Sequence, residues 1–122
     1  MGDLSKYFNK SEIACPCCGI SNIQPETMAK ADEIREYLDR PLKITSGMRC
    51  IKHNLSVDGK ADSEHPHGYA LDFACNTGAE RYELIQAMMT KGIRRIGVYK
   101  DKLTVHMGCA GKPWPQDVLW IC

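Results

Sequence analysis

SEHPHGYALDFA, residues 63–74, joins a polar, turn-forming half to a half that alternates like a strand. Side chains along residues 69–74 point to opposite faces in turn, because a strand has a period of two residues. The large apolar residues all fall on one face: Tyr69, Leu71 and Phe73. The other face carries Asp72 between two alanines. We therefore expect the first face to build the core and the second to leave space over the Asp72 carboxylate.

The later stretch KLTVHM, residues 102–107, places His106 on the face opposite to its apolar residues. If both strands belong to one sheet, His106 and Asp72 project from the same surface, and His65 in the preceding turn can close over them. Two neutral imidazoles and one carboxylate suit Zn²⁺, with a fourth position left for water. The pattern predicts a three-ligand zinc site, which is more typical of catalysis than of structure.

The alternative for this stretch is a polar turn that feeds a strand without binding metal. A histidine beside a turn is usually only a polar surface residue, and the spacing of His65 and Asp72 alone does not separate the two interpretations. His67 follows Pro66 and has no place on a strand face. We expect His67 to have a structural or supporting role rather than to bind the metal.

Helix and strand patterns are mixed along the rest of the chain. Residues 25–40 open with proline and carry apolar residues at steps of three or four, and residues 77–91 open with the capping box TGAE. Strand patterns cover residues 42–46, 69–74, 93–99 and 102–107, the last two joined by the hairpin-like YKDK. This order predicts an α+β fold with a small, mostly antiparallel sheet flanked by helices.

The composition fits one soluble domain over residues 1–122. With 16 basic and 15 acidic residues, the formal net charge of +1 gives no electrostatic basis for binding nucleic acid. No stretch approaches the roughly 18 apolar residues of a membrane span, and the first residues show no apolar signal peptide. We expect a monomer without membrane insertion, in a reducing compartment.

The 7 cysteines are an odd set, so they cannot all pair within one chain. Cys15 and Cys18 form C-x-x-C, while Cys50 and His53 form C-x-x-H, and together they could hold a structural zinc ion. A disulfide from Cys50 to the 15–18 cluster and simple buried thiols are the alternatives. Cys75 and Cys109 each follow one of the two strands that carry the candidate metal ligands, and these two cysteines could lie near each other.

Four segments also follow a known pattern in the same order. SEHPHGYALD fits S-x-H-x-x-G-x-A-x-D, ITSGMRCIKHN at 44–54 looks like S-G-x-R followed by H-N, TVHMG resembles a closing V-H strand, and FNKSEIACPCCG at 8–19 is similar to a phage-type N-terminal segment. The chain thereby resembles the zinc D-alanyl-D-alanine metallopeptidases (peptidase family M15, subfamily A, phage-type). That group includes DD-carboxypeptidases, phage endolysin peptidases and the related hedgehog domain. The resemblance implies a hedgehog/DD-peptidase-like fold.

Carried over by position, the resemblance makes His65, Asp72 and His106 the Zn²⁺ ligands, in agreement with the strand faces. Arg49 matches the arginine that binds a substrate carboxylate or carbonyl oxygen, for which a planar guanidinium is well suited. Ser63 opens the signature and is expected to bind substrate, or else to cap the turn. His53 and the residue after it are expected to stabilise their loop.

The sequence departs from the pattern where a general base is expected. Many relatives carry Asp or Glu three residues before the last histidine, where this chain has Leu103, expected on the core side. Many also carry Asp two residues after it, where this chain has Gly108. Asp101 in the preceding hairpin is the nearest acidic residue, and we expect it to act as the catalytic base, although an ordinary turn aspartate fits equally.

Together these observations predict a zinc peptidase that acts on peptidoglycan stem peptides, either as a DD-carboxypeptidase or as an endopeptidase. The resemblance suggests a phage or prophage lytic enzyme that stays in the cytoplasm until it reaches the cell wall, or a component of the phage particle. The competing hypothesis is a non-catalytic, zinc-stabilised module that binds the wall or a phage structure.

Overall fold

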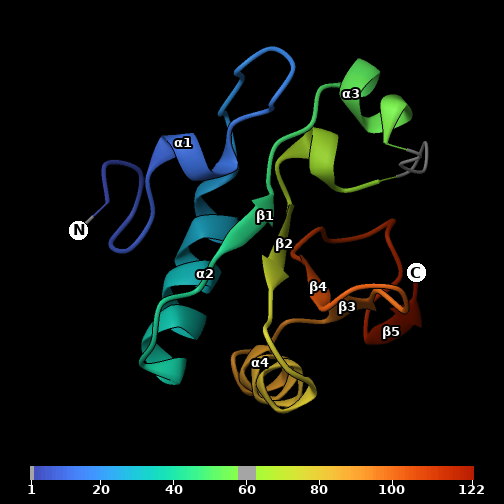
Figure 1. Ribbon diagram of the computed structural model, residues 1–122. Helices are drawn as coiled ribbons and strands as arrows, with labels where there is room; N and C mark the ends of the chain where they lie inside the picture. The colour runs from blue at the N-terminus through green and yellow to red at the C-terminus, as the bar shows by residue number, and fades with distance from the viewer. Residues whose placement is uncertain (1, 58–62) are drawn as a thin grey trace.

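The computed structural model describes residues 2–57 and 63–122. Its centre is a five-stranded sheet of order β1-β2-β4-β3-β5 (Figure 1). The strands are β1 (Ile44–Ser46), β2 (Ala70–Ala74), β3 (Arg95–Val98), β4 (Thr104–Gly108) and β5 (Val118–Ile121). Neighbouring strands are antiparallel except for β3 and β5, which are parallel. The predicted α+β class and mostly antiparallel sheet are therefore confirmed.

Two long helices pack together beside this sheet in Figure 1. The helices are α1 (Lys10–Ile13), α2 (Pro25–Leu38), α3 (Ile51–Ser56) and α4 (Gly78–Thr90), and a 3₁₀ turn, η1, spans His65–His67. Helix α2 begins with proline at its first position and ends at Asp39, which adopts a left-handed conformation with φ 52°. It is therefore slightly shorter than the predicted segment.

The N-terminus of α4 is capped almost as the sequence predicts. The Thr77 hydroxyl accepts a hydrogen bond from the Glu80 N–H at 3.1 Å. The Glu80 carboxylate accepts from the Asn76 N–H at 2.9 Å, one residue earlier than a capping box requires. The first of these interactions satisfies a backbone donor that the first turn of a helix leaves free, and the second ties down the residue before the N-cap.

The core lies between the long helices and one face of the sheet. Its central members are buried side chains from α2, β2, α4 and β4: Met28, Ala31, Ile34, Leu71, Phe73, Leu84, Met88, Val105 and Met107. In the β2–β4 ladder, Phe73 faces Val105. The alternation predicted for both strands is thus correct, and it directs their polar residues to the other face of the sheet.

Three features of the fold differ from the sequence predictions. Leu103 precedes β4 and is 36% exposed rather than in the core, because strand alternation does not apply outside the ladder. Strand β5 was not predicted, and its parallel pairing with β3 depends on contacts distant along the chain. Cys75 and Cys109 follow strands that run in opposite directions, so they lie at opposite ends of the β2–β4 ladder.

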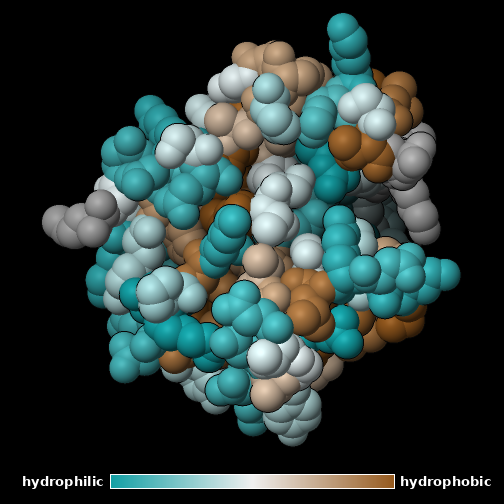
Figure 2. All heavy atoms as spheres, viewed as in Figure 1, coloured by the Kyte–Doolittle hydropathy of each residue, from teal (hydrophilic) through white to brown (hydrophobic). Residues whose placement is uncertain are grey.

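The surface is mixed, with hydrophobic patches between hydrophilic side chains (Figure 2). One hydrophobic area lies over α3, where Ile51 is 74% and Leu55 is 61% exposed. Helix α3 contacts η1, so this area lies close to the turn that carries His65. No helix among residues 2–57 and 63–122 is long and apolar enough to cross a membrane.

Candidate metal centre

His65, Asp72 and His106 meet on the sheet face that lies opposite the core. Asp72 in β2 is the direct partner of His106 in β4. The Asp72 Oδ1 atom lies 3.1 Å from His106 Nδ1 and 3.4 Å from His65 Nε2. Each residue offers one ligand atom, these atoms lie within 4.8 Å of one another, and all three residues are buried. The three side chains singled out from the sequence are therefore brought together.

The backbone around His65 orients its imidazole toward the other two residues. His65 Nδ1 lies 2.8 Å from the carbonyl oxygen of Gly47, so the Nδ1–H donates and Nε2 keeps its lone pair. His65 Nε2 is buried and has no hydrogen-bond partner in the described part of the chain. A buried polar nitrogen without a partner is costly, and a metal ion at this position would satisfy it.

Glu64 orients the second imidazole, and the sequence analysis did not identify this role. Its Oε2 lies 2.7 Å from His106 Nε2, so that nitrogen donates its proton and leaves Nδ1 to face Asp72. Its Oε1 accepts from the Ala110 N–H at 3.1 Å and lies 2.9 Å from Arg95 Nε. A carboxylate that holds the outer nitrogen of a histidine is a common companion of zinc sites.

Gly108 makes room for this carboxylate. A Cβ atom at position 108 would overlap both carboxylate oxygens of Glu64. Gly108 is also the position where the resemblance found in the sequence leads us to expect an aspartate. The carboxylate of Glu64, which comes from the turn before η1, therefore occupies the space that an acidic side chain at position 108 would enter.

Gly97 makes similar room on the other side of His106. It pairs with His106 across the β3–β4 ladder. A Cβ at Gly97 would lie 3.0 Å from His106 Cβ and 2.9 Å from the Trp120 ring. Without that atom, the rings of His106 and Trp120 pack with their centroids 5.3 Å apart. The imidazole is thus confined by packing as well as by hydrogen bonds.

The electrostatics of the centre favour a bound cation. Burial opposes ionisation of Asp72, but the neighbouring imidazoles of His106 and His65 outweigh it and lower the pKa of the carboxyl far below its usual range. Burial lowers the pKa of His65, which keeps its imidazole neutral and able to donate a lone pair. Burial also opposes protonation of His106, but Asp72 and Glu64 raise its pKa. The ionised carboxylate of Asp72 therefore faces the position between the imidazoles, while that of Glu64 lies on the outer side of His106.

A protein-family model described as Peptidase M15 matches residues 6–108. The chain belongs to the M15 peptidase family. The matched range contains all three side chains of the metal centre and Arg49. No curated protein matches the chain.

Arg49 lies at the edge of the M15 metal centre and is largely buried. Its guanidinium donates to Ser46 Oγ at 3.1 Å, to Asn54 Oδ1 at 3.1 Å and to Asp72 Oδ2 at 3.3 Å. The Tyr99 hydroxyl donates to the same Asp72 oxygen at 3.1 Å. One oxygen of Asp72 is thus held by Arg49 and Tyr99, while the other faces the two histidines.

The remaining residues singled out from the M15 sequence have simpler surroundings. Ser63 Oγ accepts a hydrogen bond from the His65 N–H at 3.2 Å, as expected of a turn-capping hydroxyl. The ring of His67 packs against Trp114 with 5.3 Å between centroids, in line with a structural role. Asp101 is exposed in the turn between β3 and β4 and has no hydrogen bond or ion pair to the three metal-centre residues within the described chain.

Proposed function

We propose that this M15 chain is a zinc-dependent peptidase that hydrolyses an amide bond in peptidoglycan stem peptides. The observation that carries the proposal is the arrangement of the two imidazoles, each held by its outer nitrogen with its inner nitrogen turned toward Asp72. Two imidazole nitrogens and one carboxylate oxygen fit Zn²⁺ and leave a position for water. The family membership supports peptidase activity.

His65, Asp72 and His106 would hold the ion. When bound, zinc supplies Lewis acidity, which lowers the pKa of a coordinated water toward about 7 and polarises a carbonyl group. Glu64 keeps the proton of His106 on Nε2. We assign the substrate carboxylate or carbonyl oxygen to Arg49, whose fixed guanidinium lies beside Asp72, and a second polar contact to Ser63.

A zinc peptidase also needs a group that accepts a proton from the attacking water. Glu64 is close to the centre, but its carboxylate already faces three N–H groups, and its pKa is lowered by His106 and Arg95 despite burial. It is therefore a poor base. We retain Asp101 as the proposed general base, since its exposed carboxylate is free to meet a bound substrate.

The resemblance to phage-type peptidases suggests where such an enzyme works. We propose a DD-carboxypeptidase or endopeptidase of a phage or prophage, acting as a monomer, that waits in the cytoplasm until it reaches the wall or travels with the particle. The apolar surface over α3 adjoins η1 and offers a place for apolar parts of the stem peptide.

The exposed position of Asp101 also favours a second candidate function. Without a base at the metal centre, the same fold would serve as a non-catalytic, zinc-stabilised module that binds wall peptides or a phage structure. This candidate predicts zinc binding without turnover.

Digestion of purified peptidoglycan separates the two functions. The zinc-loaded chain is expected to release new amino groups, identified by mass spectrometry of the products, and His106→Ala is expected to abolish release. Asp101→Asn should retain zinc and lose turnover, while Asp39→Asn, at an exposed residue of the α2 C-cap, should leave both unchanged. If wild-type protein with bound zinc releases no more amine than His106→Ala, the peptidase assignment is wrong.

A further inference from the structure

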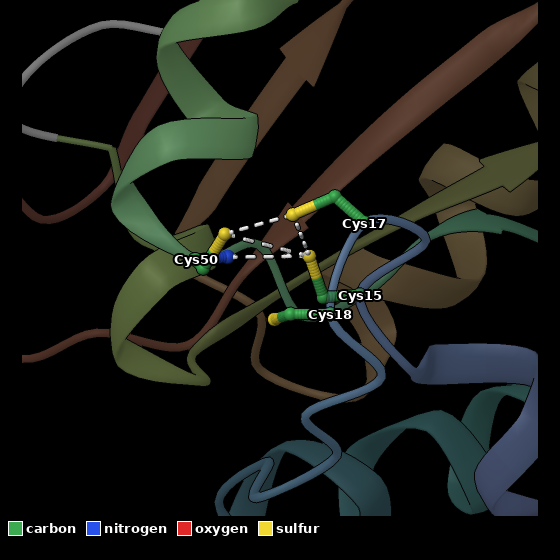
Figure 3. A group of neighbouring side chains, drawn as sticks. All are labelled: Cys15, Cys17, Cys18 and Cys50. Carbon is green, nitrogen blue, oxygen red and sulfur yellow. Dashed lines mark hydrogen bonds between the residues drawn. The ribbon is translucent and has the colours of Figure 1, made fainter.

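Four cysteines outside the metal centre form a second cluster, drawn in Figure 3. Three come from the loop after α1 and one is the N-cap residue of α3: Cys15, Cys17, Cys18 and Cys50. We call them the cysteine cluster. Each offers a sulfur atom, and these atoms lie within 4.8 Å of one another. The cluster thus joins segments that are far apart along the chain.

Two of the three sulfur–sulfur distances match a shared tetrahedral metal ion, and the third is too long for a disulfide. Cys15 Sγ lies 3.7 Å from Cys17 Sγ and 3.8 Å from Cys50 Sγ, and the last two are 3.1 Å apart. Zinc–sulfur bonds of about 2.3 Å place the sulfurs of a tetrahedral site about 3.8 Å apart. A disulfide requires about 2.05 Å, and none of the seven cysteines, all within the described part of the chain, is joined in one.

The backbone is folded to present these sulfurs. Cys15 and Ile20 are joined by a 2.8 Å hydrogen bond, and the Gly19 N–H donates to the Cys15 carbonyl at 2.8 Å. Gly19 closes this turn with φ +77°, a conformation that glycine adopts readily. The loop therefore forms a closed turn, which places its cysteines beside Cys50.

Backbone N–H groups also point at the sulfurs. The Cys50 N–H donates to Cys15 Sγ at 3.4 Å, and the His53 N–H donates to Cys50 Sγ at 3.3 Å. Hydrogen bonds of this kind stabilise a thiolate, which is the form that binds metal.

The crowding of the four groups calls for a cation. Four thiolates this close together would repel one another, since Cys17 Sγ and Cys50 Sγ alone lie 3.1 Å apart. A divalent ion removes this conflict by binding the deprotonated sulfurs. A tetrahedral set of thiolates selects Zn²⁺ over the hard cations that prefer oxygen.

We propose that the cysteine cluster binds a second zinc ion, in a closed structural site with four protein ligands. The sequence pattern predicted His53 as one of the four ligands. Cys17 lies in the cluster instead, and His53 contacts the cluster through its backbone N–H rather than its imidazole. This ion would be separate from the one held by His65, Asp72 and His106. It leaves no open position and therefore has no catalytic role.

The cluster supports the metal centre through residues 46–50. Within this segment the Gly47 carbonyl holds His65 Nδ1 and Arg49 holds Asp72. The Met48 N–H is bonded to the Ile13 carbonyl at 2.7 Å, and Cys50 follows immediately. A zinc ion on the cluster would tie this segment to the loop after α1, and so fix the backbone that positions His65 and Arg49.

Metal counting tests the proposal independently of activity. Protein purified under reducing conditions with zinc supplied is expected to contain two zinc ions per chain. The double variant His65→Ala, His106→Ala should retain one, and the double variant Cys17→Ser, Cys18→Ser should lose the other. Cys122→Ser changes an exposed cysteine outside the cluster and serves as the matched control, with two zinc ions retained.

Two further measurements hold even if the cysteine variants fail to fold. Cobalt bound to the double histidine variant should show the intense thiolate-to-metal charge-transfer absorption of a sulfur-ligated site. In wild-type protein, four thiols should resist alkylation until a chelator is added. The proposal is overturned if the double histidine variant binds no metal, if the four thiols react as fast as Cys122, or if wild-type protein contains a disulfide within the cluster.

Discussion

Replacing Glu64 with glutamine tests whether its carboxylate organises the metal centre. The side chain is 2% exposed, and its two oxygens face only N–H groups, on His106, Ala110 and Arg95. Glutamine has nearly the same shape but one oxygen and one NH₂ group. Whichever way the amide turns, its NH₂ must face a donor. If it faces His106, that imidazole must move its proton to Nδ1, the atom proposed to bind zinc.

The expected magnitude follows from these contacts. Removing one partner of a buried ion pair costs about 3–5 kcal/mol, and leaving a buried donor unsatisfied costs about 1–3 kcal/mol. Arg95 keeps a 2.7 Å hydrogen bond to the Pro115 carbonyl and a contact with the Trp120 ring. We therefore expect a loss near the lower end, about 3 kcal/mol in the free energy of unfolding, or about 12 °C in melting temperature. Zinc affinity should fall by about 10- to 100-fold.

Thermal unfolding and competition with a zinc chelator measure the two effects separately. Glu83→Gln is the matched control, because Glu83 is exposed and its ion pair with Arg40 spans 3.7 Å, so its effect should stay within about 0.5 kcal/mol. A Glu64→Gln protein with unchanged zinc affinity and a melting temperature equal to that of Glu83→Gln would refute the role assigned to Glu64.

Three further changes have outcomes that the structure fixes. Gly108→Ala should displace the Glu64 carboxylate and weaken zinc binding by at least about 10-fold in chelator competition, whereas Gly111→Ala, where an added Cβ meets nothing within 4 Å, should not. Thr27→Val should lower the unfolding free energy by about 1 kcal/mol in denaturant titration, because the buried Thr27 hydroxyl donates to the Gly68 carbonyl at 2.9 Å. Unchanged stability would contradict that role. Removal of zinc should lower the melting temperature, and returning it to 100 times its dissociation constant should restore about 2.7 kcal/mol; a melting temperature independent of zinc would exclude this coupling.

Strand alternation predicted the sheet face of two of the three metal-centre residues. Asp72 and His106 lie on regular strands, where each side chain's face follows from its position. Their pairing in register adds the contact itself. Leu103 shows the limit of this reasoning, because it lies one residue before the ladder and its exposure is set by the turn.

Glu64 could not be assigned from its neighbours in the sequence. It adjoins His65 but serves His106, because the turn carries its carboxylate across to β4. The sequence nevertheless contained a signal for this role: position 108 is glycine where an acidic residue was expected, and position 64 is acidic. Connecting them requires the close approach of the turn to β4, which only the three-dimensional structure reveals.

The cysteine cluster was predicted in part for a similar reason. The C-x-x-C spacing selects Cys15 and Cys18, and C-x-x-H adds His53. The tight turn closed by Gly19 brings Cys17 into the cluster as well, while His53 contributes its backbone N–H. The spacing of a motif alone does not show which side chains and backbone groups a turn directs toward the cluster.

The position of the metal ligands on the sheet has a kinetic consequence. Asp72 and His106 lie on β2 and β4, which have strand partners on both sides, so their amide hydrogens should exchange only through the largest openings of the domain. His65 lies in the short turn η1, outside the ladder, and is expected to open on a faster timescale. Release of a bound ion would then begin with detachment of His65 and proceed far faster than global unfolding.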